Sequence, residues 1–280
     1  MFKLTIDLRV TSACDMCCNF CHGAPKGLED SSIEIIEVVI KKLKEAGVGR
    51  IVISGGEPLM RQDTPEIILL AKSIGFDVYL STNGYRFDRY HEFSHLIDWI
   101  GIPLDGSTTT VNLEMSRGVR LFTSTSSILS FFHTNKPAHG VKVGTVVSAI
   151  NIADILNIGN LLFESSRLYP PDVWRLYDFV PRGKGFTSQH SHSVTPQQFT
   201  EVSQAAIARF GERVSPLSNE DHDNSYYFVN PDMSLVTACG NTFPYLCDLK
   251  TVSVKELSRL FETTKITKKK SRRNRQWINR

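Results

Sequence analysis

Short apolar runs rich in β-branched residues alternate along this chain with segments whose apolar residues recur every three or four positions. The runs have the length and composition of buried strands, and the longer segments have the period of amphipathic helices. The first helix combines a capping box at Ser31-Ser32-Ile33-Glu34 with an apolar stripe and ends near Gly47. We predict strands over residues 4–10, 50–54, 77–81, 99–104, 141–147 and 173–180, and further helices over 65–73, 121–132 and 153–165.

Six strand and helix units in series predict an α/β fold in which a parallel sheet curls into a partial (βα)6 TIM-type barrel. We expect residues 1–185 to form this core and residues 186–262 to form a C-terminal extension that covers the barrel. Residues 263–280 are expected to be a disordered basic tail. No internal repeat is visible outside that tail.

Composition agrees with a globular enzyme. The chain has 280 residues, of which 41% are hydrophobic and 22% charged, so it can bury a full core. No stretch approaches the length of about 18 apolar residues that a membrane span needs, and the first residues resemble a strand more than a signal peptide. We therefore expect a cytoplasmic protein without a membrane partner.

The net charge of +3 conceals an asymmetry. Eight of the 32 lysines and arginines lie between Thr263 and Arg280, where no acidic residue occurs, and the remaining 24 face 29 acidic residues. We expect a solvated terminus here, and nonspecific attraction to nucleic acid or an anionic surface is the alternative.

The strongest chemical signal is a cysteine cluster after the first strand. Cys14, Cys18 and Cys21 have the spacing Cys-x-x-x-Cys-x-x-Cys, with Phe20 before the last cysteine. Three thiolates can hold a four-iron cluster and leave one iron open to a small molecule. The alternatives are a zinc site, which normally separates its cysteine pairs by more residues, and a disulfide scaffold, which a chain of this size does not need.

Other motifs also follow predicted strands. Gly55-Gly56-Glu57-Pro58 follows the second, Ser81-Thr82-Asn83-Gly84 ends the third, and Asp105-Gly106 follows the fourth. In α/β barrels the loops after the strands form the active site, so these motifs should meet at one mouth. The two glycines lack Cβ atoms and allow close backbone approach to a ligand, and the Glu57 carboxylate suits an ammonium group.

In this order the motifs resemble the radical S-adenosylmethionine superfamily. The resemblance implies a [4Fe-4S] cluster on Cys14, Cys18 and Cys21, S-adenosylmethionine as cosubstrate, and an external one-electron reductant of the flavodoxin or ferredoxin type. It implies contacts to S-adenosylmethionine from the residues Phe20, Gly55, Gly56, Glu57, Thr82, Asn83, Asp105 and Arg117. One departure is Leu104, since relatives commonly have a serine before the aspartate.

Four basic residues in the second half of the chain indicate what kind of substrate it binds. Lys142 and Arg175 lie on predicted strands, where a charge against the covering helices would be costly, so they should point into the barrel, where each charge needs a counter-anion. With Arg182 and Lys184 they predict a site for a phosphorylated small molecule. The alternative is internal pairing, for example of Arg175 with Asp178, and solvated loop charges.

A narrower resemblance is to viperin-like enzymes, which dehydrate nucleoside triphosphates at the ribose. It rests on the stretch 174–177, on Ser218-Asn219 and on Asn224-Ser225-Tyr226, and it implies a nucleotide-binding Lys142 and a catalytic Tyr226. Gly144 departs from it, because viperins have asparagine there. The alternatives are a maturase of a peptide or cofactor and, in another class, a noncatalytic iron-sulfur or nucleic-acid-binding protein.

The remaining cysteines and histidines carry weaker expectations. Cys17, Cys239 and Cys247 are too few for an auxiliary cluster and are expected to be idle. His190 and His192 are expected to lie in a solvated linker before a capped helix that begins near Thr195.

Overall fold

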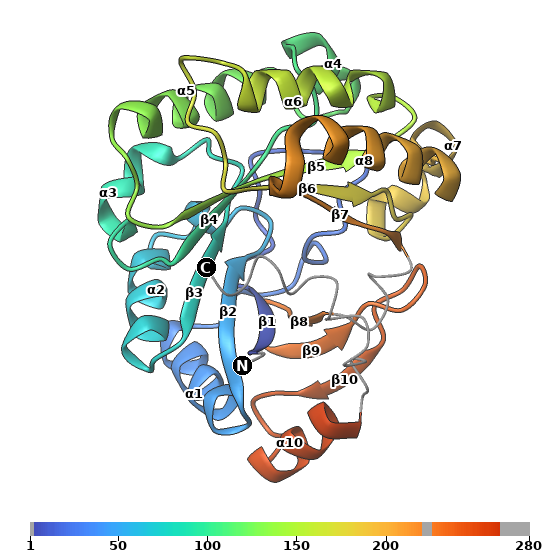
Figure 1. The fold of residues 1–280 in the computed structure, drawn as a ribbon. Helices are drawn as coiled ribbons and strands as arrows, with labels where there is room; N and C mark the ends of the chain where they lie inside the picture. Colours follow the sequence, from blue (N-terminus) through green and yellow to red (C-terminus); the bar gives the residue numbers. More distant parts are fainter. Residues whose placement is uncertain (1–2, 220–225, 264–280) are drawn as a thin grey trace.

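A 10-stranded sheet organises the protein, with the strand order β10-β9-β8-β1-β2-β3-β4-β5-β6-β7. The computed structural model describes residues 3–219 and 226–263. Figure 1 shows the sheet curving around an interior, with helices α1 to α6 and α8 on its outer side. The predicted α/β class and partial barrel are confirmed. The predicted basic tail, 263–280, lies outside the described residues except for Thr263.

The predicted strands and helices all form, with ends shifted by a few residues. The parallel strands are β1 (Leu4–Arg9), β2 (Val48–Ser54), β3 (Asp77–Ser81), β4 (Trp99–Pro103), β5 (Gly140–Val147), β6 (Val173–Asp178) and β7 (Val214–Leu217). The helices are α1 (Ile33–Glu45), α2 (Thr64–Ser73), α3 (Tyr90–Phe93), α4 (Thr109–Glu114), α5 (Leu121–Thr134), α6 (Ile155–Phe163), α7 (Gln189–His192) and α8 (Pro196–Phe210). Neither α3, α4 nor α7 was predicted, since each is only four to six residues long.

Alternation along the strands separates two faces of the sheet. Ile6 and Leu8 on β1 are fully buried in the core that also contains Ile36 and Ile40 of α1. Asp7, which lies between them, points to the opposite face and is only partly buried. The outer face is therefore the apolar contact with the helices, and the inner face carries polar side chains.

The C-terminal part extends the sheet at both edges. Strand β7 pairs with β6, whereas β8 (Tyr227–Val229) pairs in parallel with β1 at the other side. Strands β9 (Ser234–Thr237) and β10 (Tyr245–Asp248) continue antiparallel, and α10 (Val254–Thr263) follows them. Figure 1 shows this hairpin and α10, in orange and red, beside α1.

Two helix starts were predicted from capping motifs, with different outcomes. Thr195 and Gln198 form a reciprocal capping box at the start of α8, as predicted. At α1 the N-cap is Ser32 and its side chain makes no capping hydrogen bond to the backbone, so the capping box predicted from Ser31 is wrong. Within the described residues, no helix combines the length and apolar character needed to cross a membrane.

Candidate active site

Arg9 connects the cysteine loop after β1 to the neighbouring strands. This arginine is 3% exposed and donates from Nη2 to the His22 carbonyl and from Nη1 to Asn230 Oδ1, both at 3.1 Å. Its guanidinium lies 4.2 Å from the centroid of the Phe228 ring. The cysteine loop is thus tied to the strands β1 and β8 before any cofactor binds.

The three predicted ligand thiols lie in one loop with different environments. Cys14 and Cys21 are exposed, whereas Cys18 is 5% exposed. Backbone N–H groups approach two of the sulfurs: Met16 N lies 3.4 Å from Cys14 Sγ, and Gly23 N lies 3.3 Å from Cys21 Sγ. Burial raises the pKa of Cys14 to about 11 and also raises the pKa of Cys18. Loading the site must therefore displace protons from these thiols.

The arrangement fits a multi-iron cluster better than a single ion. Among the residues that the structure describes, no three His, Cys, Asp or Glu side chains converge closely enough to hold one metal ion. Cys21 is close enough to both Cys14 and Cys18 for its charge to raise their pKa values. A [4Fe-4S] cluster takes each thiolate on a different iron and needs no such convergence.

Cys17 contacts the loop after β6. Lys184 Nζ lies 3.5 Å from Cys17 Sγ, and Lys184 N donates to the Cys21 carbonyl at 3.3 Å. Gly183 has a φ of +55°, and a Cβ atom there would lie 3.3 Å from the Cys21 carbonyl oxygen. The loop after β6 therefore packs directly on the cysteine loop, which the sequence did not indicate.

The glycine pair after β2 approaches the backbone of the cysteine loop. Gly56 N donates to the Thr11 carbonyl and Glu57 N to the Ala13 carbonyl, both at 2.8 Å. A Cβ on Gly55 would lie 2.4 Å from Thr11 O, and one on Gly56 would lie 2.3 Å from Ala13 O. Both positions consequently require glycine for this packing, and the predicted approach to a ligand remains a prediction.

The Glu57 carboxylate is fully buried and already accepts hydrogen bonds from three donors. Oε1 accepts from Leu59 N at 3.0 Å and from Thr82 Oγ1 at 2.7 Å, while Oε2 accepts from Asn83 N at 2.6 Å. Burial raises the pKa of Glu57 to about 7, against the opposing effect of these hydrogen bonds. The side chain thus joins the ends of β2 and β3, and its contact with a cosubstrate ammonium remains a prediction.

Asn83 connects the same layer to the cysteine loop. Asn83 is 8% exposed and donates from Nδ2 to Asp15 Oδ1 at 2.7 Å, one residue after Cys14. Its Oδ1 accepts from Tyr85 N at 2.9 Å. The third strand, the glycine pair and the cysteine loop therefore meet at one mouth, as the barrel argument predicts.

A second group of side chains at this mouth consists of Arg117, Asp105 and Phe20, which lie beside the cysteine loop. Arg117 Nε donates to Asp105 Oδ2, its Nη1 lies 3.6 Å from Cys18 Sγ, and its guanidinium lies 4.6 Å from the centroid of the Phe20 ring. Burial opposes the charged form, but the Asp105 carboxylate, with Cys18 and Cys21 beside it, raises the pKa of Arg117 overall. A fixed cation therefore stands beside the cysteine loop, where it could receive a carboxylate.

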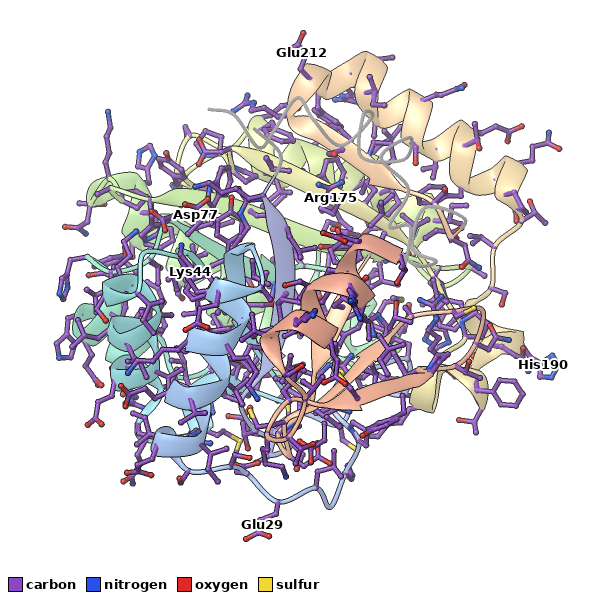
Figure 2. The ribbon with its side chains drawn as sticks, turned by 90° about the horizontal axis from the view of Figure 1, so that it is seen from below. Glu29, Lys44, Asp77, Arg175, His190 and Glu212 are labelled. Atoms are coloured by element: carbon purple, nitrogen blue, oxygen red, sulfur yellow. The ribbon has the colours of Figure 1, made fainter. Side chains whose placement is uncertain are left out.

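Lys142 and Arg175 occupy the interior below this mouth, with two tyrosines. Lys142 Nζ lies 3.4 Å from the Tyr177 hydroxyl, and the charges of Lys142 and Arg175 lower the pKa of Tyr177 against the effect of burial. The same two cations act on Tyr226, although burial raises the pKa of Tyr226 overall. In the view of Figure 2, Arg175 lies near the middle of the molecule, whereas Glu29, His190 and Glu212 lie at its outline.

Arg182 and Lys184 do not join these interior cations. Arg182 is 1% exposed and donates from Nε to the carbonyl of Gly240 in the β9–β10 connection. Lys184 lies against Cys17. The predicted phosphate-binding rim of four basic residues is therefore divided between the interior and the cysteine loop.

His192 was expected to be solvated, and this is wrong. It is fully buried, with its ring 5.6 Å from that of Phe20 and 5.4 Å from that of Phe179. The signal that sequence reasoning missed is the four-residue helix α7, whose Ser188 cap also donates to the Asn19 carbonyl at 3.1 Å. His190 is exposed, as expected.

Comparison with known proteins agrees with this site. The family model of the Radical SAM superfamily matches residues 8–134. The chain is 36% identical over 257 residues to a probable GTP 3′,8-cyclase of Methanothermobacter thermautotrophicus, covering 85% of this chain and 77% of the relative. It is 24% identical over 272 residues to an S-adenosylmethionine-dependent nucleotide dehydratase of Lacinutrix mariniflava, covering 90% of this chain and 54% of the relative.

A solved structure is similar in fold. The SuiB protein of Streptococcus suis, bound to the precursor peptide SuiA, superposes with a TM-score of 0.72 at 12% identity, over 92% of this chain and 65% of SuiB. The chain thus spans about half the length of the Lacinutrix relative and two thirds of SuiB. With the cysteine loop, the glycine pair and the family match in agreement, the chain belongs to the radical S-adenosylmethionine superfamily.

Proposed function

We propose that this radical S-adenosylmethionine enzyme acts on a nucleotide, with dehydration at the ribose of a nucleoside triphosphate as the specific reaction. The observation that carries the proposal is the pair of interior cations, Lys142 and Arg175, beside the Tyr177 and Tyr226 rings. Cations on the inner face of a barrel suit an anionic ligand, and phosphates are the anionic groups of a nucleotide. The names of two relatives, a nucleotide dehydratase and a GTP cyclase, support the same class.

Different residues at the mouth would hold the cluster and S-adenosylmethionine. Cys14, Cys18 and Cys21 would hold the [4Fe-4S] cluster, and Arg117 with the Glu57, Thr82 and Asn83 layer would hold S-adenosylmethionine beside it. With an electron from a flavodoxin or ferredoxin type donor, the bound cluster supplies reductive cleavage of S-adenosylmethionine to methionine and a 5′-deoxyadenosyl radical, which takes a hydrogen atom from the substrate.

The interior residues determine which hydrogen atom is taken. A primary carbon radical attacks C–H bonds with little intrinsic selectivity, so the position of the substrate decides the product. Lys142 and Arg175 would hold the phosphates, which leaves the ribose next to them and nearer to the mouth. Tyr226, which precedes β8 and is influenced by the charge of Arg175, would lie against the sugar.

The test is anaerobic reconstitution followed by a screen of nucleotides for 5′-deoxyadenosine release. We expect a nucleoside triphosphate to stimulate release, and deuterium placed at ribose C4′ to appear in 5′-deoxyadenosine. Lys142→Ala and Arg175→Ala should weaken nucleotide binding and leave the iron content unchanged. Stimulation by a peptide, or by no nucleotide, would contradict the proposal and favour a maturase, while membership of the superfamily would stand.

A further inference from the structure

Asp7 is an acidic residue on the inner face of the barrel that none of the motifs contains. It lies between the fully buried Ile6 and Leu8 on β1, so its side chain points away from the helices. It is partly buried, and its Oδ1 accepts a hydrogen bond from Ser54 Oγ on the neighbouring strand β2. The carboxylate is therefore held in a fixed position inside the proposed substrate site.

The charge of Asp7 acts on the same groups as the interior cations. Burial raises its pKa, and Arg9, Ser54 and Lys142 act in the opposite direction. Its charge also influences Tyr177 and Tyr226. The charges of Arg9 and, more weakly, Lys142 act on Asp7, and of these two cations Lys142 is the one in the proposed substrate site.

A carboxylate whose charge reaches a phosphate-binding lysine balances the buried Arg9 but weakens the attraction of the site for phosphate. A carboxylate accepts hydrogen bonds at about four positions, of which Ser54 occupies one. Its buried oxygens therefore favour an occupant that carries hydrogen-bond donors close to its phosphates. In a nucleotide the group bonded to the phosphates is the ribose, and the base lies beyond it.

We propose that Asp7 accepts hydrogen bonds from the ribose hydroxyls of the substrate and thereby selects ribonucleotides over 2′-deoxyribonucleotides. The proposal rests on the proposed nucleotide function and deepens it. An acidic residue that accepts from a ribose 2′-hydroxyl is a known solution in dinucleotide-binding folds, so the chemistry is available to a carboxylate. Asp7 therefore distinguishes ribose from deoxyribose, whereas Lys142 binds the phosphates of either kind of nucleotide.

The test is equilibrium binding to cluster-loaded protein, measured by calorimetry for ATP, GTP, CTP and UTP, for their 2′-deoxy counterparts and for inorganic tripolyphosphate. We expect the wild type to prefer a ribonucleotide by about tenfold, the effect of one or two hydrogen bonds to a charged group. Asp7→Asn should reduce that preference to less than about threefold. It should bind tripolyphosphate at least as tightly as the wild type, because a repulsive charge has been removed.

Two variants complete the design. Lys142→Ala should weaken binding of all ligands, tripolyphosphate included, and preserve the ratio of ribonucleotide to deoxyribonucleotide. Ser54→Ala keeps the charge of the Asp7 carboxylate but removes the hydrogen bond that fixes its position. It should therefore reduce the ratio of ribonucleotide to deoxyribonucleotide binding without improving tripolyphosphate binding.

The outcomes separate the two proposals. An unchanged ratio in folded Asp7→Asn, or weaker tripolyphosphate binding by this variant, would overturn the role of Asp7 while the nucleotide function stood. Binding of no nucleotide by the wild type would overturn both. The circular dichroism spectrum and iron content of each variant establish that it is folded and loaded.

Discussion

Arg117 and Asp105 form an ion pair in which the carboxylate is fully buried at the mouth of the barrel. Asp105 Oδ1 accepts from Val146 N at 2.6 Å, so both oxygens are engaged. Because Arg117 also lies 3.6 Å from Cys18 Sγ, the pair connects the ends of β4 and β5 to the cysteine loop.

Arg117→Ala should destabilise the cluster-free protein by about 3–5 kcal/mol, because it leaves a buried carboxylate without its cation. The measurement is urea unfolding followed by circular dichroism. In the double variant Arg117→Ala with Asp105→Asn, the uncompensated charge is absent and part of the loss should be recovered. A double variant that is as unstable as the sum of the two single variants would show that the pair is not coupled.

Cys17→Ser should retain about four irons and four sulfides per chain after reconstitution, whereas Cys18→Ser should lose them. The reason is that Cys17 lies against Lys184, while Cys18 lies beside Arg117 within the group of ligand thiols. Cys247→Ser on β10 is the matched control and should behave like the wild type. Loss of iron in Cys17→Ser with retention in Cys18→Ser would reverse the assignment.

Glu57 should make the cluster-free protein less stable as the pH rises from about 4.5 to about 7. Its folded pKa of about 7 exceeds the ordinary value of 4.5, so the folded state binds the proton more tightly and loses stability when that proton leaves. The shift corresponds to about 3 kcal/mol over this interval.

Glu57→Gln should remove this part of the pH dependence and should also cost about 1–3 kcal/mol at low pH, because an amide cannot accept from all three donors. Urea unfolding at pH 5 and pH 7 gives both quantities. Glu66→Gln, at an exposed position on α2, is the control and should keep the wild-type curve. An unchanged pH slope in Glu57→Gln would show that Glu57 is ionised throughout.

The parts of the fold that the sequence predicted are those with a strong local pattern. Strand β3 has the predicted ends, and β1, β5 and β6 differ from prediction by only one or two residues at one end. In each, inward residues alternate with apolar core residues. Strands β7 to β10 are only three or four residues long, too short for a period to be visible, and their place in the sheet depends on distant pairing with β6 and β1.

The same distinction holds at the candidate site. Most of the residues that meet at the mouth could be found because they lie in loops directly after strands, whereas Arg117 lies between α4 and α5 and was found from the family resemblance. The roles of Arg9, Arg182 and His192 could not, since each depends on contacts with residues far away in the chain, such as Arg9 with Asn230 and Arg182 with Gly240. A basic residue after a strand indicates that a charge is present but does not indicate its partner.

His192→Leu should leave the stability of the cluster-free protein unchanged or increase it. The ring packs between Phe20 and Phe179, and its Nε2 is buried without a hydrogen-bond partner among the described residues. Its Nδ1 lies 3.2 Å from the Ser188 carbonyl, which also accepts from Ser191 N at 3.1 Å and so keeps a partner without the imidazole. An apolar side chain of similar size therefore removes the desolvation cost at Nε2 and keeps the packing.

His192→Ala is the matched variant for His192→Leu and should be destabilised by about 2 kcal/mol or more, because it leaves a cavity behind the cysteine loop. Thermal unfolding compares the two variants, and binding of S-adenosylmethionine to the reconstituted protein tests whether Nε2 serves the cofactor. Since the packing argument assigns His192 only a supporting contact with Phe20, His192→Leu should bind S-adenosylmethionine as the wild type does. If this variant is as stable as the wild type but binds the cosubstrate tenfold more weakly, Nε2 is a direct ligand contact and the packing account is wrong.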